Sequence, residues 1–516
     1  MTRPELNIAF RPATVPSRAN EVSNLLNAVQ DLLLPFIRSA DEDTAAEVHP
    51  GLSTQDEGPR NGLVERHNPY DLAQLMNIDL PETGLAQAGF LKQVEQILNY
   101  SVNTWHRGFM SKLYTATDAP GLAAELILAT LNTQVHTYEV SPALTMIEKH
   151  TTRTLAALFG LHGSHAGGIT TQGGSSSNTT SIVIARNTLY PETKKQGNAV
   201  NGLKLILFTS VHGHYSIEKA AQMLGFGSSS VWSVPVDPKT GSMNPSALPP
   251  LILKAKYEGY TPFYLNVTAG TTVLGSYDPI TSLAEICKEH NLWLHIDASW
   301  GGSAIFSPTH KHKLKGSHLA NSIAINPHKM MGVPVTCSFL LGADMRQFHT
   351  SNTVPASYLF HHSESPSEVY DLADLTLQCG RKGDSLKLYL SWIYYGTEGY
   401  AKQIDTAFDT SAYLANLVSE HSDLVLISEN PPPCCQVCFY YAKDGKLHED
   451  GEDNGNITKQ VVQGLVVKGF MIDYAAGERG PLMRPVVSRE TGRETVKALV
   501  EAVVDLGGKV WESGGA

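Results

Sequence analysis

Short apolar runs alternate with helical patterns through the middle of the chain. Five runs of four to six residues are apolar enough to be buried strands, and segments with helical periodicity lie between several of them, at 216–224 and 279–290 for example. The five runs are residues 203–208, 262–267, 292–296, 322–325 and 337–341. Strands that alternate with helices form a mostly parallel sheet with helices on both faces. The sequence therefore predicts an α/β fold for the central part of the chain.

The two ends of the chain have different patterns. Residues 22–37 repeat apolar side chains at helical spacing, and the polar stretch 39–69 has the acids, glycines and prolines of a loop or linker. From about residue 395 we expect a long helix, followed by strands at 424–427 and 436–441 and a helix at 493–506. We therefore divide the chain into an N-terminal segment of helices and linker (1–115), a large domain (116–390) and a small α+β C-terminal domain (391–516).

Composition and charge narrow the class of protein. The chain has 516 residues, of which 42% are hydrophobic and 17% charged, as in globular proteins with a large core. A net charge of −11 without a basic block argues against nucleic-acid binding. Six cysteines are too few for a disulfide scaffold and fit a reducing compartment. No apolar run reaches the length of a membrane span. We expect a soluble cytoplasmic enzyme that binds neither nucleic acid nor membrane.

Chemically useful side chains follow the predicted strands. In an open α/β sheet, ligands bind beyond the carboxyl ends of the strands, so residues at these ends share one crevice. A Gly/Ser loop at 168–178 also leads into an apolar helix at 180–186. The side chains that we expect at the strand ends are those of His214, Thr272, Asp297, Asn326 and Lys329.

These residue types fit one cofactor, pyridoxal 5'-phosphate. The cofactor needs a lysine that binds it covalently and an acid beside its pyridine nitrogen, and Lys329 and Asp297 supply them. An ionised Asp297 keeps the ring nitrogen protonated, so that the ring accepts the electron pair left when a bond at Cα breaks. His214 is placed to stack on the ring, and Ser176 and Ser177, at the start of a helix, to hold the phosphate.

Three segments resemble the pyridoxal-phosphate-dependent amino-acid decarboxylases of group II. They are 214–219 (HYSIEK), 294–302 (LHIDASWGG) and 326–332 (NPHKMMG). The similarity extends from about residue 106 to 506 and is greatest to glutamate and cysteine-sulfinate decarboxylases. It implies pyridoxal-phosphate fold type I, as in aspartate aminotransferase, and α-decarboxylation of an L-amino acid. It also implies a homodimer with shared active sites, with which the N-terminal segment is associated.

The resemblance assigns roles to the cofactor residues. Lys329 is similar to the lysine that binds the cofactor, Asp297 to the partner of the pyridine nitrogen and His214 to the stacking histidine. The positions that resemble contacts to the phosphate or the ring are Ser176, Ser177, Thr272 and Asn326.

Two further positions resemble catalytic and substrate residues of the family, and two depart from its pattern. Tyr358 falls where relatives have a mobile-loop tyrosine that returns a proton to Cα in the neighbouring subunit after CO2 leaves. Arg484 matches an arginine that binds a substrate carboxylate bidentately. Where relatives read Phe-Asn-Gln-Leu, residues 110–113 read Met-Ser-Lys-Leu, so that Lys112 replaces a glutamine on the substrate side and Tyr114 follows it.

The cations Arg484 and Lys112 favour a small acidic substrate, which is converted to its amine and CO2. Glutamate, aspartate and cysteine sulfinate all stay open, because a pocket separates substrates that differ by one methylene by only about 1–3 kcal/mol. The alternative is a decarboxylase or aldehyde synthase for aromatic or other non-acidic amino acids. A scaffold that keeps the cofactor without turnover is a third reading. Cys435 and Cys438 have no second ligand pair at zinc-like spacing, and we expect no metal.

Overall fold

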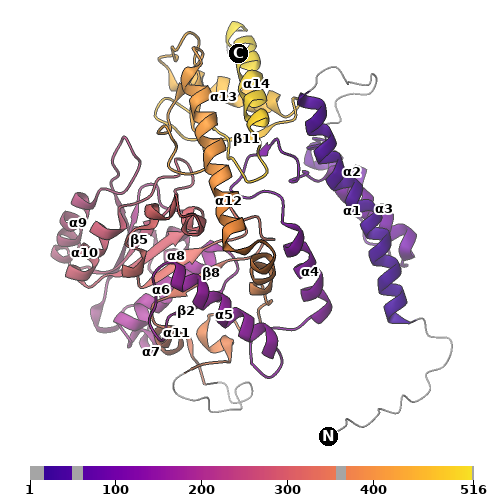
Figure 1. Cartoon of the computed structure of the whole chain (residues 1–516). Helices are drawn as coiled ribbons and strands as arrows, with labels where there is room; N and C mark the ends of the chain where they lie inside the picture. Colours follow the sequence, from indigo (N-terminus) through magenta and orange to yellow (C-terminus); the bar gives the residue numbers. More distant parts are fainter. Residues whose placement is uncertain (1–16, 49–61, 356–367, 514–516) are drawn as a thin grey trace. The chain divides into compact units, whose positions relative to one another are not determined.

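The computed structural model describes residues 17–48, 62–355 and 368–513 (Figure 1). Their contacts divide the chain into a smaller unit, Met1–Gly108 with Val466–Gly469, and a larger unit, Phe109–Leu465 with Phe470–Ala516. The three-part division at residues 115 and 390 stays a prediction. None of the described helices combines the length and the apolar character needed to cross a membrane.

The smaller unit is helical. Its helices are α1 (Arg18–Val48), α2 (Pro69–Met76) and α3 (Ala86–Tyr100), and both α1 and α2 pack against α3. Asn68 caps α2, since its side chain accepts hydrogen bonds from the backbone N–H groups of Tyr70 (3.1 Å) and Asp71 (3.0 Å). Proline at the first position of α2 adds a backbone that already has the helical φ.

Helix α1 is longer than the sequence pattern predicted. We expected a loop or linker over 39–69, but residues 39–48 continue the helix, so that part of the prediction is wrong. The apolar periodicity ends near residue 37, whereas alanine and glutamate in the next turns have high helix propensity. Propensity thus prolongs the helix beyond its apolar stripe. Residues 49–61 lie outside the described part of the chain.

A sheet of seven described strands forms the centre of the larger unit. Its order is β2-β8-β7-β6-β5-β3-β4, and β8 is the strand that runs antiparallel to its neighbours. The strands are β2 (Gly167–Thr170), β3 (Leu205–Ser210), β4 (Val231–Val234), β5 (Thr261–Thr268), β6 (Trp293–Ala298), β7 (Ser322–Ile325) and β8 (Phe339–Gly342). The mostly parallel α/β sheet predicted from the sequence is confirmed.

Both faces of this sheet are buried. Along β3, Leu205 and Leu207 join one apolar core and Ile206 and Phe208 join another, because successive side chains of a strand point to opposite faces. Helices α6 (Gly174–Leu189) and α8 (Ser216–Met223) contribute to the first core, and α9 (Leu248–Tyr257) and α10 (Ile280–His290) to the second. Burial on two faces explains why the strands read as continuous apolar runs.

A second sheet of the larger unit has five described strands in the order β1-β11-β12-β10-β9. These are β1 (Phe109–Met110), β9 (Leu424–Leu426), β10 (Phe439–Tyr441), β11 (Met471–Ala475) and β12 (Leu482–Arg484). Helices α13 and α14 pack on this sheet and on each other. The remaining α-helices of the unit are α4 (Ala119–Leu131), α5 (Pro142–Leu158), α7 (Thr193–Gln196), α11 (Met345–Asn352), α12 (Ser385–Glu420), α13 (Gly451–Leu465) and α14 (Arg493–Glu512).

A buried ion pair links Glu148 of α5 to Arg381, in the segment before α12, beside the end of β2. Arg381 Nη2 lies 2.9 Å from Glu148 Oε1, and both side chains are almost completely buried. Glu148 also accepts hydrogen bonds from the backbone N–H and the hydroxyl of Thr170 at the end of β2, both at 2.9 Å. The carboxylate is thus compensated by charge and by hydrogen bonds, as a buried charge requires.

Replacement of Glu148 by alanine is expected to lower the free energy of unfolding by about 3–5 kcal/mol, because it leaves the Arg381 charge buried without its partner. Chemical denaturation of wild type and variant measures this difference. Glu258→Ala is the control, since Glu258 pairs with Lys254 at 3.9 Å on the surface, where loss of a pair costs about 0–1 kcal/mol. Equal destabilisation by the two substitutions would contradict the role given to the buried pair.

Candidate active site

A cavity of about 230 Å³ opens where the parallel strands of the large sheet end. It is lined by residues that follow β3, β5 and β7, by Asp297 within β6 and by the start of α6. The sequence-predicted residues that it brings together are His214, Thr272, Asp297, Asn326 and Lys329. The crevice expected from the order of strands and polar residues is therefore present.

Asp297 is held by hydrogen bonds on both carboxylate oxygens. Oδ1 accepts from the backbone N–H of Ser299 at 3.1 Å, and Oδ2 accepts from the Asn178 amide at 2.9 Å. Burial alone would raise the pKa of Asp297, but these hydrogen bonds and the charges of Lys329 and His214 outweigh it, so the pKa lies below its ordinary value. Asp297 is thus an ionised carboxylate in a buried position.

A second layer of contacts fixes Asn178. His295 Nε2 lies 3.0 Å from Asn178 Oδ1, and His295 Nδ1 lies 2.8 Å from the hydroxyl of Ser322. Burial lowers the pKa of His295 to about 4, although the nearby charge of Asp297 opposes the shift. A neutral His295 therefore orients the amide that holds Asp297.

Lys329 faces the same cavity without a fixed partner. In the described part of the chain, no group forms a hydrogen bond or ion pair with its Nζ atom. Burial lowers the pKa of Lys329, and the charge of Asp297 only partly opposes this shift. A lysine with a lowered pKa is more often present as the neutral amine, which is its nucleophilic form.

His214 lies between these charges and an exposed tyrosine. Its ring is tilted by 40° against Tyr215, with centroids 4.5 Å apart, and its Nδ1 accepts a hydrogen bond from the backbone N–H of Ser216 at 3.2 Å. Burial lowers the pKa of His214, a shift that the charge of Asp297 opposes. The imidazole is therefore suited to a neutral stacking contact.

The start of α6 has the features of a phosphate site. Among the described residues no side chain caps this helix, and its first N–H groups carry the partial positive charge of a helix N-terminus. A Cβ on Gly174 would lie 2.4 Å from Ser299 Oγ, so a side chain at this position would displace the Ser299 hydroxyl. Ser299 Oγ is buried and, within the described residues, has no hydrogen-bond partner. The start of α6, the unpartnered Ser299 hydroxyl, the ionised Asp297 and the unpaired Lys329 together fit pyridoxal 5'-phosphate.

The residues that we predicted to contact the phosphate differ in their burial and in their hydrogen-bond partners. Ser177 Oγ is buried at 2.7 Å from the hydroxyl of Thr171, and Ser176 is part-buried beside the cavity-lining Ser175. In the amide orientation that satisfies its neighbours, Asn326 donates to Ser338 Oγ at 2.5 Å and accepts from the backbone N–H of Gly174 at 3.3 Å. The roles of Ser176, Ser177, Thr272 and Asn326 stay predictions.

Sequence reasoning missed several residues that line the cavity. The missed residues are Gly174, Ser175, His212, Tyr215, Thr268, Gly270, Ser299, Trp300 and His328. Most of them are direct neighbours of predicted residues, so the signal was their place after a strand. Residue type alone does not separate them from the other glycines, serines and aromatic residues of the chain, and only the fold shows which of them face the cavity.

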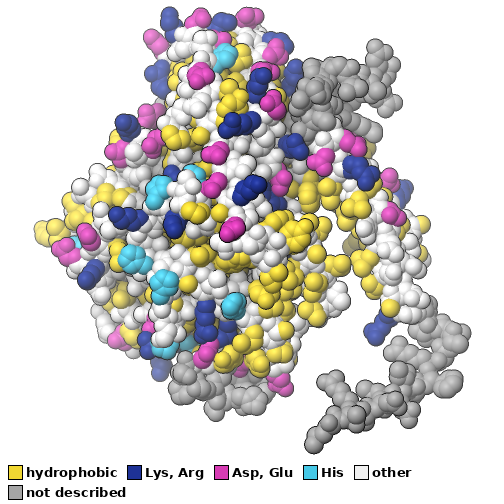
Figure 2. Space-filling model, in the orientation of Figure 1, with side chains coloured by type: hydrophobic (Ala, Val, Ile, Leu, Met, Phe, Trp, Pro, Cys, Tyr) yellow, Lys and Arg dark blue, Asp and Glu magenta, His cyan; other side chains and the backbone are white. Residues whose placement is uncertain are grey.

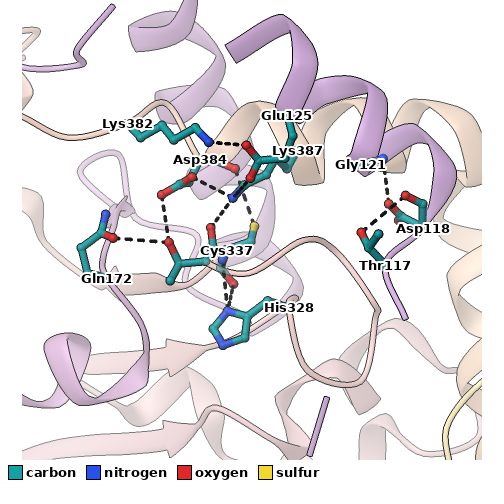
Figure 3. Close-up of polar contacts among 11 residues, drawn as sticks. Thr117, Asp118, Gly121, Glu125, Gln172, His328, Cys337, Lys382, Asp384 and Lys387 are labelled. Carbon is teal, nitrogen blue, oxygen red and sulfur yellow. Dashed lines mark hydrogen bonds and ion pairs between the residues drawn. The ribbon is translucent and has the colours of Figure 1, made fainter. Parts of the chain in front are cut away.

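A buried charge cluster lies behind the segment that carries Lys329 (Figure 3). Lys387 Nζ on α12 lies 2.8 Å from carboxylate oxygens of both Glu125 and Asp384, and it donates to the backbone carbonyl of Thr336 at 2.6 Å. Burial opposes a charged lysine, but Asp384 and the other acceptors outweigh it and raise the pKa of Lys387. The ammonium thus binds the returning end of the 326–338 segment.

A hydrogen-bonding contact of His328 joins the two ends of the same segment. His328 Nδ1 lies 3.1 Å from the backbone nitrogen and 2.7 Å from the backbone oxygen of Cys337. Burial lowers the pKa of His328 to about 4. Since His328 precedes Lys329, this contact and the Lys387 cluster together fix the backbone on which Lys329 stands.

The predicted substrate residues converge at the small sheet. Arg484 on β12 is buried and donates from Nη1 to the backbone carbonyl of Thr272, a cavity-lining residue, at 2.7 Å. Lys112 and Arg484 both contact Asp473, which the sequence did not single out. Tyr114 is 43% exposed and lies against Phe109. Tyr358 lies outside the described residues, and its role stays a prediction.

Comparison with known proteins gives one family and three informative relatives. The pyridoxal-dependent decarboxylase conserved domain matches residues 69–442. An L-aspartate decarboxylase of Metarhizium robertsii is 47% identical over 496 residues, which cover 96% of this chain and 98% of that protein. A glutamate decarboxylase-like protein of Gibberella zeae is 35% identical over 528 residues, with 95% and 98% coverage.

Solved structures show the same fold. Mouse CSAD in its apo form is 31% identical, with a TM-score of 0.84 over 95% of this chain and 99% of that one. This likeness confirms the predicted pyridoxal-phosphate fold type I.

Acid is expected to destabilise the protein partly through His295. The folded pKa, about 4, lies below the value of about 6.5 for an unfolded chain. Between these values the unfolded chain binds a proton that the folded chain excludes, so the free energy of unfolding falls as the pH is lowered. His295→Gln is expected to reduce the fall between pH 6.5 and 4.5 by about 2–3 kcal/mol.

Urea unfolding at the two pH values measures this difference. His162→Gln, at an exposed histidine, controls for loss of an imidazole as such. If His295→Gln keeps the full wild-type fall in stability, His295 is not buried in its neutral form.

Proposed function

Because the chain belongs to the pyridoxal-dependent decarboxylase family, we propose that it removes the α-carboxyl group of a small acidic L-amino acid as CO2. Family membership confirms the resemblance and the cofactor predicted from the sequence. L-Aspartate is our first candidate substrate, supported by the 47% identical relative named as an L-aspartate decarboxylase. The observation that carries the acidic class is the pair of cations, Lys112 and Arg484, that meets at Asp473, with Arg484 also in contact with the cavity-lining Thr272.

Bound pyridoxal 5'-phosphate supplies an electron sink for the pair released when the Cα–carboxylate bond breaks. Asp297 holds a fixed negative charge where the pyridine nitrogen is expected, and the hydrogen bonds from Ser299 and Asn178 keep it ionised. His214, which lines the cavity, would stack on the ring of the bound cofactor. Lys329 offers the neutral amine that exchanges with the substrate amine. The phosphate is held by the start of α6 and, we propose, by the unpartnered Ser299 hydroxyl.

The remaining steps concern the proton and the substrate side chain. Tyr358, from the neighbouring subunit, is proposed to hold the proton that Cα receives after CO2 leaves. Arg484 and Lys112 attract the second carboxylate of an acidic substrate and so orient its α-carboxylate. Arg484 is buried, so its charge acts at reduced screening, whereas Lys112 is half-exposed and adds a weaker contribution.

We also propose a cytoplasmic homodimer. Helix α4 exposes a stripe of apolar side chains, and Figure 2 shows hydrophobic side chains gathered where α4 lies in Figure 1. The stripe consists of Leu122, Leu126, Ile127 and Leu131, which are 43–54% exposed. A second copy of the chain that covers this stripe would remove it from water, and a contiguous exposed apolar patch commonly marks such an interface.

The proposed reaction is tested by CO2 release from aspartate, glutamate, cysteine sulfinate and tyrosine by the purified protein loaded with cofactor. We expect release from at least one acidic substrate and none from tyrosine. Lys329→Ala is expected to lower the rate by at least about 100-fold, because it removes the cavity amine. Lys254→Ala, at a surface lysine on α9, is the matched control and keeps the wild-type rate. Release from tyrosine alone would overturn the acidic class.

The dimer is tested by sedimentation equilibrium. We expect twice the chain mass of 56.0 kDa for wild type and the mass of one chain for Leu122→Glu/Leu126→Glu, because two buried carboxylates would oppose association. Leu253→Glu, at a 61% exposed leucine on α9, is the control and stays dimeric. A monomeric wild type, or a double variant that stays dimeric, would refute the interface.

A further inference from the structure

Two cations of the proposed substrate site share one carboxylate of the protein itself. Asp473 Oδ2 lies 2.6 Å from Lys112 Nζ and 3.1 Å from Arg484 Nη2. Asp473 stands on β11, and its direct partner across the strand pair is Arg484 on β12. The position of the carboxylate is therefore set by the sheet and by two ion pairs. Two cations and one anion leave the site with a single net positive charge.

The two terminal nitrogens of Arg484 donate hydrogen bonds to different acceptors. Nη1 donates to the carbonyl of the cavity-lining Thr272 at 2.7 Å, whereas Nη2 donates to the carbonyl of Ser111 at 3.3 Å and to the carboxylate of Asp473. A guanidinium can donate two hydrogen bonds to one carboxylate from either of two pairs of nitrogens, Nε with Nη2 or Nη1 with Nη2. Both pairs include Nη2. Asp473 therefore occupies the donor that a bidentate contact with a substrate needs.

These contacts give the site a near end and a far end. Nη1 contacts Thr272, which lines the cavity, and Nη2 contacts Asp473, so we take Nη1 as the near end and Nη2 as the far end. A substrate carboxylate that stops at Nη1 gains a charge-assisted hydrogen bond without displacing a protein group. One that reaches further by a methylene meets the carboxylate of Asp473, and two like charges repel at short range.

We propose that Asp473 selects the substrate by side-chain length, so that the site takes L-aspartate in preference to L-glutamate. This inference rests on the proposed decarboxylation of an acidic amino acid and deepens it. Asp473 acts as a barrier at the far end of the cation site, and it also holds Arg484 and Lys112 in place. A residue that only held the two cations would affect both substrates alike. The ratio between the substrates is therefore the informative quantity.

Asp473→Asn keeps the shape of the side chain and removes its charge. We expect the ratio of kcat/KM for glutamate to kcat/KM for aspartate to rise by about 10-fold or more, within the range that one methylene commonly controls. The gain is expected mainly as a lower KM for glutamate. Asp473→Ser, which also removes bulk, is expected to raise the ratio further. Asp505→Asn is the matched control, since Asp505 pairs with Lys509 at 2.8 Å on α14.

A measurement on the wild-type protein does not depend on the folding of a variant. Succinate and glutarate carry the two carboxylates of aspartate and glutamate without the amine, and we expect succinate to inhibit more strongly. If glutarate inhibits as strongly, or if both Asp473 variants change the two substrates by the same factor, the length-selecting role is wrong while the acidic-substrate proposal stands. If the wild type releases CO2 from none of aspartate, glutamate and cysteine sulfinate, both proposals fail.

Discussion

The site depends on keeping one carboxylate ionised where water is excluded. Asp297 lies in the core, and a buried charge without compensation costs far more than a folded chain can offset. Ser299 and Asn178 supply hydrogen bonds to its two oxygens, and a neutral His295 fixes the Asn178 amide. These groups come from α6 and from β6 with the turn after it, so the packing of helix on sheet sets the electrostatics of the cavity.

The large sheet explains why these groups meet. Its central strands are buried on both faces, so most of their side chains are apolar, and many of the polar groups lie where the strands end. Parallel neighbours end at the same edge, which brings Asp297, Asn326 and Lys329 together from separate strands. The cluster of Lys387 then fixes the returning segment beyond β7, which supports the backbone on which Lys329 stands.

What could be predicted from the sequence follows from the same physics. Apolar runs and the polar residues after them revealed β3, β5, β6 and β7 and the cavity residues Asp297 and Lys329. Asp473 could not be found this way, because it lies within β11 and does not follow any of the apolar runs that predicted strands, and the strands on either side, β1 and β12, have only two and three residues. Its contact with Lys112 joins positions far apart in the chain, and only strand pairing brings them together.

The molecule thereby separates the chemistry from the choice of substrate. The groups that handle the cofactor stand at the edge of the large sheet, where the buried carboxylate of Asp297 is compensated by hydrogen bonds that depend on one another. Lys112, Asp473 and Arg484 stand on the small sheet, and two of the three are partly exposed to solvent. Exposed charges are screened and tolerate replacement at small cost. Substitution at the small sheet can therefore alter which acid is bound while the ionised Asp297 and the reactive Lys329 stay unchanged.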